Sequence, residues 1–411
     1  MKFTSFILGA SLVFGVAGCP GQAAMSDLKN KLEGRQAGLD AGDSTELIGD
    51  LATVGATTPT GKIVKDILLG KIDPYTDEKP TKPLWAKGTT QCAADTCCIW
   101  RWIALDMAAK FRGSSGRCNR FARAAIRQGF HDAGPWNKTI GYGGADGSLI
   151  LANEITRTEN NGLQEIIGVT KSWYNAYKQY GVGMADLIQF GATVAVVTCP
   201  LGPRVRSFVG RKDSSRPNAD NLMPSVLADA NSLIALFKAK TIMPHGLTAL
   251  VGAHSTSQQQ FVNTNRAYDP QDGTPGVWDV VFYGQTIGMN STPPRVFKFP
   301  SDVNLAAHPQ IRDEWVKFAS YGGQEDWNED FAKEYVRLSL LGVNNINNLT
   351  ECTMALPAAV KTFTSQDQSF LDTWLAGGYP TLGSIVLDGT TITSAILSRL
   401  GEILKNLLTT H

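Results

Sequence analysis

The sequence has almost no excess of charge, because 38 Lys and Arg residues nearly balance 37 Asp and Glu residues and leave a formal net charge of +1. This balance argues against a protein that binds nucleic acid or an anionic membrane through a basic surface. Seven cysteines are too few for a small scaffold held mainly by disulfides. Repeats with a period of about 20–50 residues are absent, which argues against solenoids and propellers. What is present is a globular composition, with 43% hydrophobic and 18% charged residues.

Long hydrophobic runs are also missing, except near the start of the chain. Lys2 precedes an apolar stretch over residues 3–18, and small residues follow. A basic start, an apolar middle and a small-residue exit are typical of a secretory signal peptide, here residues 1–24. A membrane anchor and a bacterial lipoprotein signal ending at Cys19 are the alternatives, although the stretch is short for a membrane span. We therefore expect a secreted, extracellular protein without a membrane anchor.

The cysteines and the glycosylation motifs agree with export. Loss of the signal peptide together with Cys19 leaves six cysteines, and an even number in an exported chain predicts three disulfides. Six cysteines permit many pairings, so the sequence alone does not select one. Three Asn-x-Thr motifs are candidate glycosylation sites: Asn137, Asn290 and Asn348.

The rest of the chain divides into a polar segment, a helical body and a tail. Residues 25–90 are rich in Gly, Thr and Pro and predict a linker or pro-segment. Residues 91–380 form the expected folded body, and residues 381–411 the expected C-terminal tail. Apolar residues in the body repeat at helical spacing, as at Trp100, Ile103 and Met107. Strand signals are scarce, so the predicted fold class is all-α.

Two of the five histidines lie in informative surroundings. Arg127 and His131 are four residues apart, which places them on one face of a helix. The arginine disfavours a protonated imidazole, so the pair offers a neutral base beside a fixed cation. Such a pair suits the cleavage of a bond that leaves negative charge on oxygen. An apolar helix delivers His254 into a buried setting, as an axial haem ligand requires, but the spacing alone does not select this role. A zinc site needs three or four ligands, and no cluster of Cys or His accompanies either histidine.

Together with other stretches, these motifs resemble the secreted fungal haem peroxidases, class II of the plant, fungal and bacterial peroxidase superfamily, which includes the lignin and manganese peroxidases. The matching stretches follow the family's order over roughly residues 92–355: 127–132, 143–148, 159–162, 185–190, 199–200 with 210–211, 253–255 and 300–302. The resemblance implies an all-α, two-lobed, monomeric protein with one haem b between a distal and a proximal half. It also implies hydrogen peroxide as the oxidant and phenols or small aromatics as electron donors.

On the distal side, the resemblance assigns a role to each of four residues. His131 would move a proton between the two peroxide oxygens, and Arg127 would stabilise the departing oxygen. Asn160 would accept the other ring N–H of His131 and so fix its tautomer. Phe130 would be the distal aromatic residue, as expected of the exported class.

On the proximal side, the resemblance makes His254 the iron ligand and Asp302 the acceptor of its second N–H, which would give the imidazole more negative character. The aromatic residue that the family carries before its proximal calcium loop is replaced by Gln271. Tyr268 and Trp278 are the nearby aromatic residues that could fill this role.

The resemblance also implies two calcium ions and a disulfide pattern. Hard oxygen ligands suit calcium. The distal ligands would be Asp132, Gly144, Asp146 and Ser148, and the proximal ones Ser255, Asp272, Thr274, the Val277 carbonyl and Asp279. The implied pairs are Cys92–Cys98, Cys97–Cys352 and Cys118–Cys199.

The electron donor is the least determined feature. Manganese-oxidising members carry acids where this chain has Arg120, Ala124 and Gln260. Because Mn²⁺ requires several anionic oxygens, the usual manganese site is missing. The radical-forming surface Trp of lignin peroxidases is replaced by Ala249. A generic peroxidase is therefore expected, and the alternatives are a manganese or versatile peroxidase with a rearranged donor site and a non-catalytic secreted haem or calcium protein.

Overall fold

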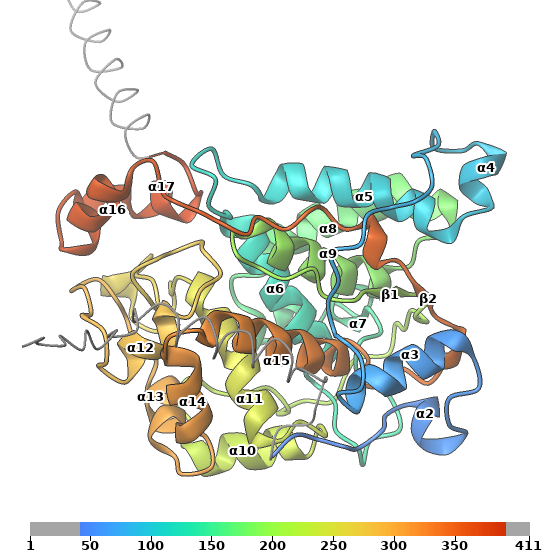
Figure 1. Cartoon of the computed structure of the whole chain (residues 1–411), viewed down its shortest axis with the longest axis horizontal. Coiled ribbons are helices and arrows are strands. Elements are labelled where there is room, and N and C mark those ends of the chain that lie inside the picture. Colours follow the sequence, from blue (N-terminus) through green and yellow to red (C-terminus); the bar gives the residue numbers. More distant parts are fainter. Residues whose placement is uncertain (1–41, 392–411) are drawn as a thin grey trace, which may run out of the picture. The chain divides into compact units, whose positions relative to one another are not determined.

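The structure is a computed structural model, and it describes residues 42–391. The expected signal peptide and the last 20 residues of the expected tail lie outside the described residues. Helices dominate the described part, and the expected all-α fold is confirmed (Figure 1). The longer helices are α3 (Pro59–Leu68), α5 (Thr96–Phe111), α6 (Arg120–Ala133), α8 (Gln164–Tyr177), α9 (Met184–Thr198), α10 (Ala230–Lys238), α11 (Pro244–Val251), α13 (Pro300–Ala307), α14 (Arg312–Ala319), α15 (Gly323–Leu338) and α16 (Gln368–Leu375).

Extended structure in the described residues is limited to short pieces. Strands β1 (Phe208–Val209) and β2 (Thr350–Glu351) pair in antiparallel fashion. Within residues 42–391 no single helix is both long enough and apolar enough to span a membrane. One pair of consecutive segments meets both criteria when taken together, Gln164–Tyr180 and Met184–Thr198, but the pair is bent by 119°.

Helix α9 is the centre of the first half of the fold. All of its residues are buried, as expected of a helix that is apolar on every side. It packs against both α5 and α6 (Figure 1). Gly129 permits this close approach, because a Cβ there would lie 2.7 Å from the Cβ of Ala192. Asn119 caps the start of α6 by accepting hydrogen bonds from two backbone N–H groups. The cap and the close packing fix the face of α6 that carries Arg127 and His131.

Helix α11 holds the corresponding position in the second half. It packs against α15 and continues into the 3₁₀ turn η4 (Gly252–Thr256), which carries His254. A Cβ on Gly252 would come within 2.4 Å of Trp327 Nε1, so glycine is required for this contact. Trp327 Nε1 donates to the Ala249 carbonyl at 2.9 Å and ties the end of α11 to α15. His254 is therefore held on a rigid support.

In its described part, residues 42–90, the expected linker or pro-segment is folded, which excludes the linker alternative there. Helices α2 (Asp50–Thr53) and α3 (Pro59–Leu68) lie in this part, and Val64, Ile67 and Leu68 have no exposed surface. Asp50 accepts hydrogen bonds from the backbone of residues 346 and 347 at 2.7 and 3.1 Å. This segment therefore belongs to the folded body, because a linker would not supply fully buried side chains to the core.

The C-terminal boundary also differs from the expected one. The tail was expected to begin at residue 381, but helix α17 (Gly383–Leu387) follows the 3₁₀ turn η8 (Pro380–Leu382) directly. Val386 is fully buried and packs with residues of α16. The packed chain therefore continues beyond residue 380.

Within residues 42–391 the structure contains three disulfides, and they are the three pairs that the resemblance implies. Cys92–Cys98 closes a short loop at the start of α5, and Cys97–Cys352 ties α5 to the residue after β2. Cys118–Cys199 joins the residues just before α6 and just after α9. The last two link segments that are 255 and 81 residues apart, so they constrain the helices around the cavity described next.

Candidate active site

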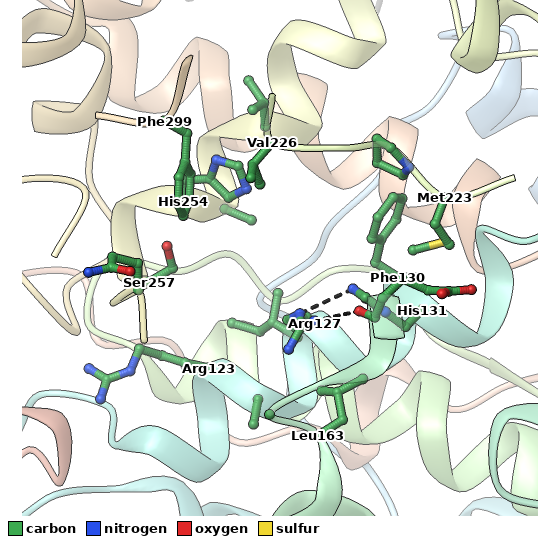
Figure 2. Close-up of a pocket in the computed structure, with 18 of the residues that line it drawn as sticks. Arg123, Arg127, Phe130, His131, Leu163, Met223, Val226, His254, Ser257 and Phe299 are labelled. Carbon is green, nitrogen blue, oxygen red and sulfur yellow. Dashed lines mark hydrogen bonds between the residues drawn. The ribbon is translucent and has the colours of Figure 1, made fainter. Parts of the chain in front are cut away.

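A cavity of about 1240 Å³ lies between α6 and the α11–η4 segment. Its volume exceeds the range of about 300–1,000 Å³ that is usual for small-molecule sites, so it can hold a large ligand. Figure 2 shows Arg127 and His131 on one side of the open space and His254 across it. The structure therefore brings the two singled-out histidines to one cavity from opposite sides.

Hydrogen bonds fix the orientation of the His131 ring. Asn160 Oδ1 lies 2.7 Å from His131 Nδ1, and an amide oxygen can only accept, so Nδ1 carries the proton. His131 Nε2 is then the basic nitrogen, and Arg127 Nε donates to it at 3.1 Å. The predicted neighbours of His131 are thus in contact with it.

The electrostatic surroundings keep His131 neutral. Burial, and to a smaller extent the positive charge of Arg127, lower the pKa of His131 to about 3. The sequence indicated Arg127 as the reason for a neutral imidazole, but burial is the larger cause. The side chain is 7% exposed. At neutral pH Nε2 is therefore unprotonated, and its lone pair accepts the Arg127 Nε–H.

Backbone carbonyls hold Arg127 in place. Its Nη1 and Nη2 donate to the carbonyls of Asn161 and Glu159 at 2.7 and 2.8 Å. Burial lowers the pKa of Arg127 to about 10, so the side chain stays positively charged at neutral pH. Phe130 stacks on Phe237 and meets the His131 ring edge-on.

Sequence reasoning missed the residues that support Asn160. The Glu154 carbonyl accepts from Asn160 Nδ2 at 2.8 Å, which sets the amide so that its oxygen faces His131. The Glu154 side chain is buried and receives hydrogen bonds from Asn218 N and Arg157. These residues lie in irregular segments, where no periodicity in the sequence signals a role.

Across the cavity, Asp302 orients His254. The two Asp302 oxygens lie 3.0 and 3.2 Å from His254 Nδ1, which leaves Nε2 without this partner. Burial alone would lower the pKa of His254, but the charge and hydrogen bond of Asp302 outweigh it and raise the pKa. The His254 side chain lines the cavity and keeps 33% of its surface exposed. Nε2 is therefore a basic nitrogen suited to a metal.

The aromatic residues around His254 differ from those suggested by the sequence. Phe282 and Phe299 meet its ring edge-on, at centroid distances of 5.9 and 5.4 Å. Trp278 instead stacks on Trp327 away from this ring. Gln271 is buried and accepts a hydrogen bond from Ser257, which lines the cavity. Neither Tyr268 nor Trp278 contacts the His254 ring among the described contacts, so neither takes the role suggested for it.

Buried carboxylates surround the residue after His131. Asp132 accepts from the backbone N–H groups of Gly147 and Leu149 at 3.1 and 3.3 Å. Burial raises the pKa of Asp132 well above its usual range, and the charge of Asp146 raises it further. Within residues 42–391 neither acid has an ion pair with Lys or Arg. This donor set, with Gly144 and Ser148 in the same loop, fits a bound cation.

A second group of oxygens surrounds the residue after His254. Ser255 Oγ donates to the Val277 carbonyl at 3.0 Å, and Thr274 Oγ1 lies 3.2 and 3.0 Å from Asp272 and Asp279. Burial raises the pKa of Asp272 well above its usual range and that of Asp279 to about 7. Asp272 Oδ2 is buried and has no hydrogen-bond partner in the described part of the chain. An unpaired buried carboxylate oxygen fits a cation ligand.

The usual manganese positions carry no acid, and their arginine is neutralised locally. Arg120 forms ion pairs with Glu165 on α8, at 2.8 Å, and with Asp388 after α17. Ala124 and Gln260 lie at the same cavity. The nearest acids are therefore engaged with a cation rather than arranged around an open metal position.

His245 and the candidate glycosylation sites do not line the cavity. His245 is 4% exposed and is paired with Asp43 and Glu314 at 2.7 and 3.1 Å. Its group with Glu314 and Asp330 is compact enough to hold a metal ion, but Lys333 and Lys317 already balance these acids. Of the candidate glycosylation sites, Asn290 and Asn348 are exposed and Asn137 is half-buried.

Comparisons with known proteins agree with this geometry. The sequence profile of the peroxidase family matches residues 104–321. A peroxidase from Arthromyces ramosus is 28% identical over 286 residues, which cover 64% of this chain and 77% of the relative. Ligninase LG5 from Phanerodontia chrysosporium is 29% identical over 287 residues, with 64% and 75% covered. Manganese peroxidase 3 from Phlebia radiata is 27% identical over 284 residues, with 64% and 77% covered.

Proposed function

Because the chain belongs to the peroxidase family, we propose that His131 and Arg127 activate hydrogen peroxide while His254 binds the iron of a haem b. The enzyme is a haem peroxidase of the fungal class that includes ligninases and manganese peroxidases. The observation that carries the assignment of roles is the placement of a neutral His131 and a basic His254 on opposite sides of one cavity.

The residues present fit a haem. The cavity has room for a flat macrocycle, and the His254 side chain exposes a third of its surface there. Asp302 holds Nδ1, so Nε2 of His254 is the nitrogen available to iron. When bound, the haem supplies the redox chemistry: it gives two electrons to peroxide and recovers them singly from donors.

His131 and Arg127 handle the proton and the charge. A peroxide O–H takes the place of the Arg127 Nε–H as donor to His131 Nε2, which accepts the proton. The same nitrogen then returns this proton to the outer oxygen as it departs as water. Asn160 keeps the proton of Nδ1 in place, so the ring does not change tautomer during the transfer. Arg127 stabilises negative charge on the departing oxygen.

Phenols or similar small aromatics are the proposed electron donors. Arg120 at the usual manganese position is paired with Glu165 and Asp388, so these acids are not free to bind a cation. Ala124 and Gln260 offer no anionic oxygen. Both polar and apolar side chains line the cavity, which suits neutral aromatic molecules. A manganese or versatile peroxidase with a rearranged acid site is the second candidate.

Two calcium ions are proposed as structural supports. Asp132, Gly144, Asp146 and Ser148 would hold one, and Ser255, Asp272, Thr274, Val277 and Asp279 the other. Each group adjoins one of the two cavity histidines in the sequence, so each ion would stiffen the backbone beside a catalytic position. Three disulfides support the proposal of an oxidising, extracellular location. We further propose that the protein acts as a monomer.

A spectroscopic assay tests the proposed function. The full chain, loaded with haem, should show a Soret band that shifts when hydrogen peroxide is added and returns as guaiacol is oxidised. Turnover of guaiacol, Mn²⁺ and a non-phenolic aromatic should be compared under the same conditions. Guaiacol oxidation with little Mn²⁺ oxidation is the expected result. A protein that binds no haem, or whose band does not respond to peroxide, would contradict the proposal, and saturable Mn²⁺ oxidation would favour the second candidate.

A further inference from the structure

A groove of about 780 Å³ lies along α5, and it shares no lining residue with the cavity between the two histidines. Six of its lining residues recur at the spacing of one helix face: Arg101, Ala104, Leu105, Ala108, Ala109 and Arg112. Residues 80 and 84 and residues 354–357 also line it. We call this surface the α5 groove.

The α5 groove exposes apolar side chains to solvent. Leu105 keeps 53% of its surface exposed, and Met354 keeps 40%. Ala108 and Ala109 carry only a methyl group each, so they leave room for another helix to approach α5 closely. Exposed apolar side chains that gather at a hollow mark a surface that binds another element.

The described part of the chain ends at this groove. Thr391 N donates to Ser114 Oγ at 3.2 Å, and Ser114 lines the groove. The Gly389 carbonyl accepts from Ser115 N at 3.0 Å and from Ser115 Oγ at 2.6 Å. Helix α17 therefore lies beside the loop that follows α5 (Figure 1), and residue 392 begins at the mouth of the groove.

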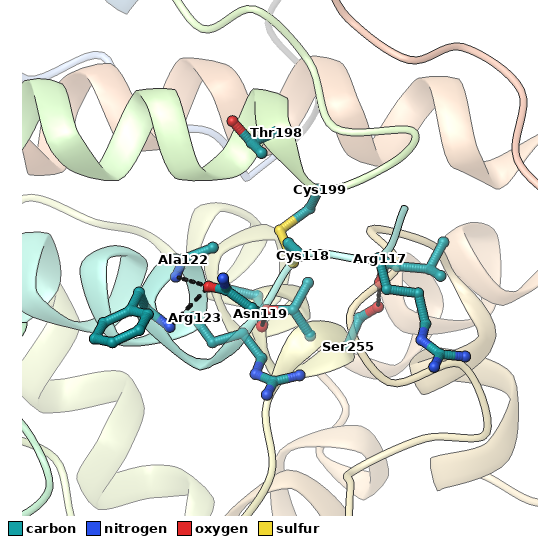
Figure 3. Close-up of a disulfide and its surroundings, with 12 residues drawn as sticks. Arg117, Cys118, Asn119, Ala122, Arg123, Thr198, Cys199 and Ser255 are labelled. Atoms are coloured by element: carbon teal, nitrogen blue, oxygen red, sulfur yellow. Dashed lines mark hydrogen bonds between the residues drawn. A yellow bond between two sulfur atoms is a disulfide. The ribbon is translucent and has the colours of Figure 1, made fainter. Parts of the chain in front are cut away.

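The loop that holds this exit point is itself firmly anchored. Arg117 Nη2 donates to the Thr390 carbonyl at 3.3 Å, and Arg117 Nη1 is paired with the buried Asp367 at 3.1 Å. Figure 3 shows Arg117 next to Cys118, which is bonded to Cys199 at the end of α9. The direction in which the chain continues is therefore tied to the body of the fold.

The sequence that follows has the pattern of an amphipathic helix. Apolar residues recur at helical spacing in Ile392, Ile396, Leu400, Ile403, Leu404 and Leu407. Polar residues fill the opposite side of the same helical pattern, with Ser398, Glu402, Lys405 and Asn406. A helix of this length is marginal in water by itself, and most of its stability comes from burying its apolar face. The segment therefore calls for an apolar surface.

We propose that residues 392–408 bind in the α5 groove as a helix antiparallel to α5. The segment starts at Ser114, beyond the end of α5, so it would run back toward Arg101. The groove face of α5 and the apolar pattern from Ile396 to Leu407 are both about three turns long. In this arrangement Leu400 would pack on Leu105. The inference does not depend on the proposed function, because the α5 groove and the histidine cavity have no residue in common.

Hydrogen–deuterium exchange of the full chain, followed by mass spectrometry, tests the proposal. Backbone amides of residues 396–407 should exchange slowly in the wild type. Leu105→Asp puts a charge into the groove, and the loss of one apolar contact predicts exchange of this segment about 10- to 100-fold faster. Leu227→Asp is the matched control, because Leu227 is 68% exposed and lies outside the groove, and it should match the wild type.

An engineered disulfide tests the register without relying on Leu105→Asp. The double variant of Leu105→Cys with Leu400→Cys should form a disulfide within one chain on mild oxidation, as peptide mapping will show. Leu105→Cys with Glu402→Cys is its control, because Glu402 lies on the polar side of the pattern and should not form the bond.

Four results would overturn the proposal. Equally fast exchange of residues 396–407 in the wild type and in Leu105→Asp would mean that the segment does not bind the groove. Slow exchange that Leu105→Asp leaves unchanged, without the disulfide, would place the segment on another surface. Disulfides between chains instead of within one would assign the groove to a second copy. Slow exchange only after phosphatidylcholine vesicles are added would assign the segment to a lipid surface. If Leu105→Asp does not fold, the two double variants decide the question.

Discussion

Replacing His131 with Leu should slow the reaction with peroxide without removing the haem site. The pKa of about 3 means that roughly one His131 ring in 10⁴ is protonated at pH 7, so nearly every molecule has its base ready. Leu cannot accept a proton, so the whole contribution of the base is lost, which is about 10²- to 10⁴-fold in rate. His254 and Asp302 lie across the cavity and do not contact the altered side chain, so haem binding should persist.

Stopped-flow absorbance provides the assay. The second-order rate constant of the peroxide-induced change in the Soret band is measured for the wild type and for His131→Leu, each corrected for haem content. His308→Leu, at a histidine outside the cavity, should react like the wild type. For the wild type, the rate constant should stay flat from pH 5 to 8 and fall as the pH approaches about 3, where Nε2 becomes protonated. A His131→Leu rate constant within tenfold of the wild-type value would refute the role of His131.

Three further predictions concern the supports of the site. Asp302→Asn removes the charge that raises the pKa of His254, so the iron should become easier to reduce, which potentiometry measures. Peroxidase activity, measured by guaiacol turnover, should fall by about 10- to 100-fold. Without calcium, Asp279 has its pKa raised to about 7 by burial, so its contribution to stability is present at low pH and is lost as the pH rises through 7. The chelated protein should then melt at a lower temperature at pH 8 than at pH 5, and added calcium should remove much of this difference. Equal melting temperatures of the chelated protein at both pH values would exclude a contribution of Asp279 to the pH dependence of stability. Ile67→Ala should cost about 2–5 kcal/mol of unfolding free energy, measured by denaturant titration, whereas a loss near zero would restore the linker interpretation of residues 42–90.

Local spacing made part of the site predictable from the sequence. Arg127 and His131 meet because they are four residues apart on one helix, and helical geometry fixes that relation. The pairing of His254 with Asp302 spans 48 residues, so only the resemblance to a family could indicate it. No local sequence pattern predicts a contact between residues so far apart in the chain.

The missed features lie where local patterns are weak. Helix α3 does not stand out in the sequence, because a polar and proline-rich stretch surrounds its three buried apolar residues. Glu154 and Asn218 act through backbone groups of irregular segments, which carry no periodic signal.

The structure of the haem-loaded protein tests the central claim most directly. The account predicts the iron bonded to Nε2 of His254, with His131 on the opposite face of the macrocycle and not bonded to the metal. Iron bonded to His131, iron bonded to both histidines, or a haem bound outside the cavity between them would contradict it.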